Sequence, residues 1–191
     1  MATPPFDVSK AVTFDLSRGQ IQKEDAEARV LVSARALFAL CQGAGPDASA
    51  TFARTTGESM GAAIAGRFEA AGTDTKGATI DAVVEHLAGE LAVAGFGSLS
   101  LERWGRALVL VVDHGPATTE GDRLLAPLLA AAISRAAKVE ARCVRLARDG
   151  DRARFLITGP RAADQVRNWL SSGVSWGEAL VRLHPGKAGE A

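Results

Sequence analysis

The stretch from Thr79 to Pro116 changes its hydrophobic period once, and this change limits the fold more than any other feature of the sequence. Its first apolar residues recur at helical spacing along one face: Ile80, Val83, Val84, Leu87 and Leu91. After Gly97 the period becomes two, and Ala107 to Val112 is a nearly continuous apolar run, typical of a strand that is covered on both faces. The pattern predicts an amphipathic helix followed by a β-hairpin that turns near Gly105.

Two helices are predicted before this stretch. The longer one begins near Asp47, a good N-cap residue, and continues to about Ala70. The pattern from Val30 to Cys41 is also helical. In an alternative interpretation, a short strand comes first and Ser33 caps the helix that follows it.

The sequence after the hairpin predicts a further helix, a second hairpin and helices near the C-terminus. The helix extends from Leu125 to Ala137, and Pro127 falls in its first turn, where a missing N–H is tolerated. The turn dipeptide Asp149-Gly150 separates two strands. The strands occupy about 139–146 and 153–158. The last helices occupy about 166–170 and 175–183, and the second of them begins with a capping box.

This order of elements predicts an α+β fold, with an antiparallel sheet of about four strands in two hairpins packed with about four to six helices. We expect residues 1–20 to form a flexible N-terminal arm and 21–160 a single α+β domain. Residues 161–184 are expected to form a C-terminal helical appendage, and 185–191 a disordered tail.

The charge balance disfavours nucleic acid as a partner. The 191 residues include 22 Lys and Arg and 22 Asp and Glu, so no basic surface for a phosphate backbone is indicated. No apolar run is long enough to span a bilayer, and the first ten residues do not resemble a signal peptide. Cys41 and Cys143 are interpreted as buried free thiols, although a disulfide is an alternative. These features predict a cytoplasmic protein.

One motif suggests an enzyme. Gly57-Glu58-Ser59-Met60-Gly61 matches G-x-S-x-G, and Asp113 and His184 follow it in the order of an α/β-hydrolase triad. That motif needs a strained turn between a strand and a helix, whereas the residues before Gly57 have a helical pattern. We therefore keep a serine hydrolase using Ser59 as a remote alternative and predict no catalytic residues.

The histidines and cysteines indicate no metal or cofactor site. His86 lies off the apolar face of its helix, so a solvated side chain is expected. His114 follows Asp113 at a strand end, where such a pair can tune a base, but ordinary turn residues look the same. No ligand spacing typical of a metal site is present, so we predict neither metal nor cofactor.

Several residues are candidates for contacts with another element or chain. Gly57 and Gly61 lie one helical turn apart and let a second element approach closely. Trp104 falls in the hairpin turn, where it is exposed unless something covers it, and Trp169 and Trp176 are further packing or interface candidates.

Apolar periodicity also nominates residues for a ligand pocket, although an ordinary packed core would use the same ones. They are Phe52, Met60, Ile64, Leu87, Leu91, Leu110, Leu128 and Cys143.

The chain resembles the 4-vinyl reductase domain, the bacterial and archaeal relative of the small TRAPP vesicle-tethering proteins. The likeness extends over about 30–158 and rests on Gly57-x-x-x-Gly61, Gly95-Phe96-Gly97, Pro116, Glu140-x-x-Cys143 and Arg154-Phe155. Ala153 stands where the family has its second cysteine, so metal binding is not carried over. The resemblance implies a homodimeric, non-enzymatic sensory or assembly module, often with a buried pocket for a small hydrophobic ligand, and a protein partner is compatible with that role.

A second resemblance is to the bacterial cellulose synthase D family, whose members are cytoplasmic oligomeric scaffolds of cellulose synthesis and export. It covers Thr79 to Pro116 and Leu124-Leu125-Ala126-Pro127, and it fades after Ala137. This likeness implies a larger oligomer with little internal cavity. Both resemblances predict self-association.

Overall fold

The computed structural model of the chain describes residues 5–23, 28–73, 78–115 and 119–183. The predictions made for Pro116, for His184 and for the tail 185–191 lie outside these residues.

The centre of the molecule is a four-stranded antiparallel sheet built from two hairpins. Its strands are β4 (Ser98–Trp104), β5 (Ala107–Asp113), β6 (Arg142–Asp149) and β7 (Arg152–Thr158). Their order is β4-β5-β7-β6, so β5 and β7 are central and β4 and β6 are edge strands. The predicted α+β class and the two predicted hairpins are confirmed.

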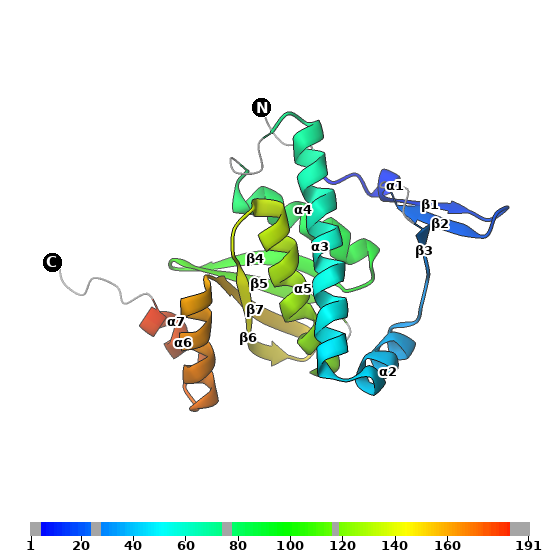
Figure 1. The fold of residues 1–191 in the computed structure, drawn as a ribbon. Helices are drawn as coiled ribbons and strands as arrows, with labels where there is room; N and C mark the ends of the chain where they lie inside the picture. The colour runs from blue at the N-terminus through cyan, green and yellow to red at the C-terminus, as the bar shows by residue number, and fades with distance from the viewer. Residues whose placement is uncertain (1–4, 24–27, 74–77, 116–118, 184–191) are drawn as a thin grey trace.

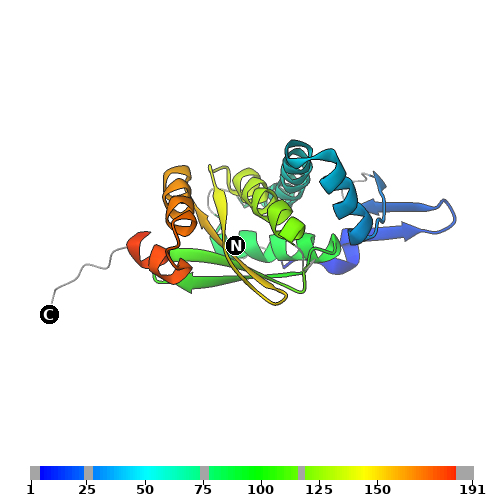
Figure 2. The same ribbon diagram turned by 90° about the horizontal axis from the view of Figure 1, so that it is seen from below.

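Three helices cover one face of this sheet (Figure 1, Figure 2). They are α3 (Pro46–Ala70), α4 (Ile80–Val93) and α5 (Thr119–Ala137). The α4 helix packs on β4 and α5 on β6, while α3 lies along α5. The α4 helix begins as the sequence predicts, because the Thr79 hydroxyl accepts a hydrogen bond of 3.3 Å from the Ala82 N–H.

The contact between α3 and α5 depends on two glycines. A Cβ atom built on Gly57 would lie 2.2 Å from the Leu128 carbonyl oxygen, and one on Gly61 would lie 2.4 Å from the Ala132 carbonyl oxygen. Any side chain at these positions would therefore push α5 away. The prediction that this glycine pair permits close packing is confirmed, and the partner is a helix of the same chain.

The other face of the sheet is covered by α6 (Pro160–Ser171) and α7 (Trp176–Leu183). The α7 helix begins at the predicted cap, where the Glu178 N–H donates to the Ser175 hydroxyl over 3.2 Å. Alternation along β5 separates two cores, since Leu110 faces α3–α5 and Val111 faces α6–α7. We call the first the helix–sheet core. Cys41 and Cys143 both lie there as buried free thiols, as predicted.

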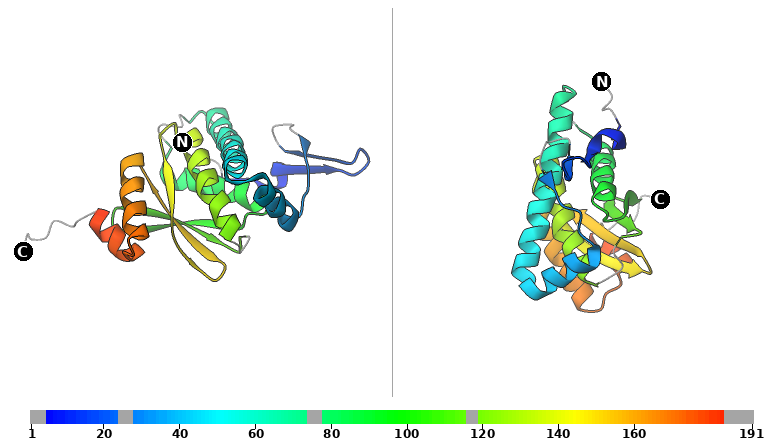
Figure 3. Two further views of the ribbon diagram at one scale, coloured as in Figure 1. Left: turned by 60° about the horizontal axis from the view of Figure 1, so that its bottom comes forward. Right: turned by 90° about the vertical axis from the view of Figure 1, so that its right-hand side faces the viewer.

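The N-terminal part of the chain forms a unit whose small sheet stands away from the main sheet (Figure 1, Figure 3), while its residues Phe38 and Cys41 pack in the helix–sheet core. It contains α1 (Val8–Ala11), a three-stranded sheet and α2 (Ala34–Ala44). The strands are β1 (Val12–Asp15), β2 (Gln20–Lys23) and β3 (Ala28–Arg29). The alternative that Ser33 caps a helix after a short strand is confirmed by its hydrogen bond with the Ala36 N–H.

Two predictions of local structure are wrong. His86 is only 2% exposed, not solvated, because Phe6 from the N-terminal segment and Phe68 from α3 pack edge-on against its ring. The α5 helix begins at Thr119, not near Leu125, so Pro127 lies inside it. The earlier start is stabilised by Asp122, whose buried carboxylate binds Arg145 and Arg148 of β6.

Candidate functional site

Seven of the eight predicted pocket residues converge in the helix–sheet core. They come from α3, α4, β5, α5 and β6: Met60, Ile64, Leu87, Leu91, Leu110, Leu128 and Cys143. All seven are buried in the structure. The eighth, Phe52, is 37% exposed near the start of α3. A ligand role for these residues stays a prediction.

Packing within the helical layer is uneven. The α3 and α5 helices are in close contact along their length, whereas α4 meets each of them over a much smaller area. Met60, Ile64 and Phe68 follow one another at four-residue spacing on α3, and the Phe68 ring lies 5.0 Å from that of His86 on α4. The α4 helix therefore meets the α3–α5 pair through a small set of buried side chains.

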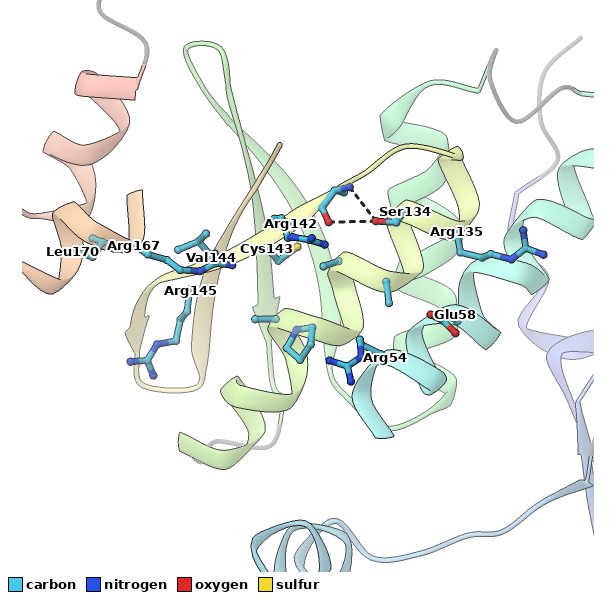
Figure 4. Close-up of a pocket in the computed structure, with 15 residues that line it drawn as sticks. Arg54, Glu58, Ser134, Arg135, Arg142, Cys143, Val144, Arg145, Arg167 and Leu170 are labelled. Carbon is cyan, nitrogen blue, oxygen red and sulfur yellow. Dashed lines mark hydrogen bonds between the residues drawn. The ribbon is translucent and has the colours of Figure 1, made fainter. Parts of the chain in front are cut away.

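An open groove of about 870 Å³ lies on the outer side of α5 (Figure 4). We call it the arginine groove. It is lined by Arg54, Glu58, Ala126, Pro127, Ala130, Ala131, Ser134, Arg135, Ala141, Arg142, Cys143, Val144, Arg145, Arg167 and Leu170. Its floor consists mainly of small residues of α5, and its walls come from α3, β6 and α6.

The end of the groove is fixed by Ser134 of α5. Its hydroxyl accepts a hydrogen bond of 3.0 Å from the Ala141 N–H and donates one of 3.3 Å to the Ala141 carbonyl (Figure 4). These bonds hold the start of β6 beside α5. Cys143, the next β6 residue that faces the helices, is buried, and this burial raises the pKa of its thiol to about 12. The thiol is therefore protonated at neutral pH and is a poor nucleophile.

Positive side chains surround the groove. Figure 4 shows Arg54 on the α3 side, with Arg142, Arg145 and Arg167 on the side of β6 and α6. Three arginines have carboxylate partners, because Arg142 binds Glu140 at 2.9 Å, Arg145 binds Asp122 at 3.1 Å and Arg167 binds Asp164 at 2.8 Å. Arg54 donates a hydrogen bond of 3.1 Å to the Thr51 hydroxyl and forms no ion pair within the described parts of the chain.

The geometry of a nucleophile elbow is not present at Ser59. This residue lies in the middle of α3, with helix on both sides of it. Asp113 binds Arg152 at 2.7 Å, and hydrogen bonding by that guanidinium lowers the pKa of the Asp113 carboxyl. His114 contacts Asp151 instead, at 2.9 Å, and both side chains are exposed. Among residues 5–23, 28–73, 78–115 and 119–183, no group of three His, Cys, Asp or Glu side chains is placed to hold a metal ion.

The predicted interface residues all make contacts within the chain. Gly57 and Gly61 contact α5, as described above. Trp104 packs edge-on against Trp176 of α7 with 5.0 Å between ring centroids, and Trp169 packs against the apolar cluster under α6 and α7. Trp104 remains 47% exposed. A role for these residues in an interface between chains stays a prediction.

Sequence comparisons give no match to a protein-family model and no match to a curated protein. A structure comparison finds similarity to the crystal structure of the phenol-responsive sensory domain of the transcription activator PoxR with phenol. The TM-score is 0.57 at 16% sequence identity, and the match covers 93% of each chain. The two proteins therefore share a fold. No helix in the described ranges is long and apolar enough to cross a membrane.

Sequence reasoning found the helix–sheet core but missed the arginine groove. The groove arginines are distributed over four elements, so no local run of basic residues indicates them. The repeat of arginine in Arg142, Arg145 and Arg148 was the available signal.

Proposed function

We propose that this chain is a non-enzymatic, self-associating regulatory module that responds to a small hydrophobic ligand held in the helix–sheet core. The observation that carries this proposal is the fold shared over 93% of both chains with a sensory domain that responds to phenol. The match includes the N-terminal unit as well as the main sheet, since so little of either chain is left out.

We place the ligand between α4 and the α3–α5 pair, where predicted pocket residues of three elements face one another. Met60, Leu87 and Leu91 come from the helices that meet there, and Leu110 faces them from the sheet. Methionine side chains adapt to irregular partners, so Met60 can move to admit a guest with little strain. A small apolar or aromatic molecule fits the chemistry of these walls.

Self-association is supported by the apolar residues of the N-terminal unit. Leu16, Val30 and Leu31 are 89%, 84% and 83% exposed, and Phe14 and Val32 of the same unit are exposed too. Val30, Leu31 and Val32 form a consecutive exposed apolar segment, which is typical of an interface. A second copy of the chain is the occupant that both family resemblances predict.

The relation to the 4-vinyl reductase domain stays a prediction, as does the cytoplasmic location. The scaffold role implied by the resemblance to the cellulose synthase D family is the second candidate. The exposed N-terminal unit favours it as well, because a scaffold also needs a surface for self-assembly.

Methyl NMR of the full chain with phenol and a panel of small apolar aromatics tests the ligand proposal. We expect ligand-induced shifts at Ile64, Leu87 and Leu91, and none at Val109 or Leu156, which lie in the cluster under α6 and α7. The second set is an internal control in the same spectrum. Shifts confined to the second set, or none with any compound, would contradict the ligand site.

A further inference from the structure

The arginine groove contains an open sheet edge. β6 is hydrogen-bonded to β7 on one side, and no strand among the described residues pairs with its other side. Alternate residues of an edge strand direct their N–H and C=O groups outward, ready to pair with another extended chain. In this structure α5 lies over one face of β6 and α6 lies against the other. The edge is therefore framed by two helices.

The floor of the groove suits a polypeptide backbone. Ala126, Ala130 and Ala131 project at most a methyl group, and Pro127 adds a flat apolar surface between them. Small side chains of this kind let a main chain approach α5 closely. The volume of about 870 Å³ is sufficient for several residues of an extended segment.

The charges around the edge select an acidic occupant. Five arginines line the groove from four elements, and Glu58 is the one carboxylate in its lining. They are Arg54, Arg135, Arg142, Arg145 and Arg167. Arg54 has no ion-pair partner within the described residues, and the partners of Arg142 and Arg167 are exposed carboxylates that can exchange. The whole chain has a net charge of zero, so this local excess of arginine is a property of the groove.

The same charges disfavour pairing of β6 with β6 of a second copy. An antiparallel pairing centred on Arg145 would place Arg145 opposite itself and Arg142 opposite Arg148. Like charges directly opposite each other destabilise a cross-strand pair. A nucleic acid strand is also less suited, because its phosphates would leave the strand-edge N–H and C=O groups without matched partners.

We propose that the arginine groove binds an extended acidic segment of a partner polypeptide, which adds to the sheet along the free edge of β6. Its backbone pairs with β6, and its carboxylates bind Arg54 and Arg142. The groove lies on the outer side of α5 and shares Cys143 with the helix–sheet core, but the inference does not depend on the proposed ligand. Binding of this segment would connect a regulatory module to a partner protein.

Fluorescence anisotropy of the full chain with a labelled peptide of alternating glutamate and valine tests this proposal. We expect saturable binding at low ionic strength that weakens with salt, since the contacts are between charges. The variant R54E/R142E should weaken binding about tenfold or more, a factor that corresponds to about 1.4 kcal/mol. The matched control R35E/R106E changes the net charge equally at exposed positions outside the groove and should bind like the wild type.

Two further probes separate strand addition from simple charge attraction. Methylation of alternate backbone nitrogens should abolish binding when the methyl groups lie on the edge that faces β6, and should be tolerated on the opposite edge. Equal binding of both methylated peptides, or equal weakening by the two double variants, would overturn the proposal. Tighter binding of an oligonucleotide of the same charge, or no peptide binding at all, would also overturn it.

Discussion

Arg67 of α3 donates a hydrogen bond of 2.5 Å to the carboxylate of Glu90 on α4. Glu90 is only 1% exposed, and it also binds Lys23 of β2. Three elements therefore meet at one buried carboxylate, and Phe6 lies over the Arg67 guanidinium with 4.8 Å to its ring centroid. This cluster attaches the N-terminal unit to the helices that line the helix–sheet core.

Glu90→Ala should destabilise the chain strongly, because it leaves Lys23 and Arg67 without their buried counter-charge. We expect a loss of about 3–5 kcal/mol in the free energy of unfolding, measured by urea denaturation. Glu85→Ala is the control, since Glu85 is exposed on the same helix and its removal should have little effect. Similar losses for both variants would contradict the structural role of the cluster.

Gly57→Ala should also destabilise the chain, because the new methyl group would collide with the Leu128 carbonyl at 2.2 Å. A lower Tm in thermal unfolding would report this effect. Gly66→Ala is a matched test in the same helix, since a Cβ atom there meets nothing within 4 Å. It should stabilise the chain by about 0.5–1 kcal/mol, the difference between glycine and alanine in a helix. The expectation fails if both variants change Tm in the same direction.

These glycines illustrate what the sequence can predict. Two glycines one turn apart predict a close approach, and the period change after Gly97 predicts a helix followed by a hairpin, because both signals are local. Thr79, Ser175 and Asp149-Gly150 likewise fix element ends through bonds or turns within a few residues.

The failures have a common physical cause in contacts between distant segments. The sequence places His86 in solvent because its cover, Phe6, lies 80 positions away along the chain. The early start of α5 depends on Asp122 binding arginines of β6. The β1–β3 sheet was not predicted, because its strands are short and largely exposed. Val12, Phe14 and Leu16 do alternate with polar residues, but this signal covers β1 alone.

Stability should fall at alkaline pH because of Cys143. Burial raises the pKa of this thiol to about 12, above its ordinary value of 9.0. Between these two values the unfolded chain loses a proton that the folded chain keeps, so stability decreases by up to about 1.4 kcal/mol per pH unit. Below pH 9.0 both states keep the proton, and this contribution is constant.

Cys143→Ala removes this dependence and provides the comparison. Urea denaturation at a series of pH values from neutral to alkaline should give a shallower loss of stability for the variant than for the wild type. Parallel curves for the two proteins would contradict the burial of the thiol in the folded chain.

Leu31→Asp should weaken self-association, because it places a charge in the exposed apolar segment of the N-terminal unit. Sedimentation velocity should show a shift from dimer towards monomer. Val181→Asp serves as the control, since Val181 is an exposed apolar residue of α7 outside that unit. An unchanged oligomer for Leu31→Asp would place the interface elsewhere.

Native mass spectrometry of the purified chain, from gentle to denaturing conditions, tests the central claim most directly. We predict a dimer that carries a non-covalent small-molecule adduct, which is released before the two copies separate. A monomer without an adduct would contradict the account, and a bare discrete higher oligomer would favour the scaffold role instead.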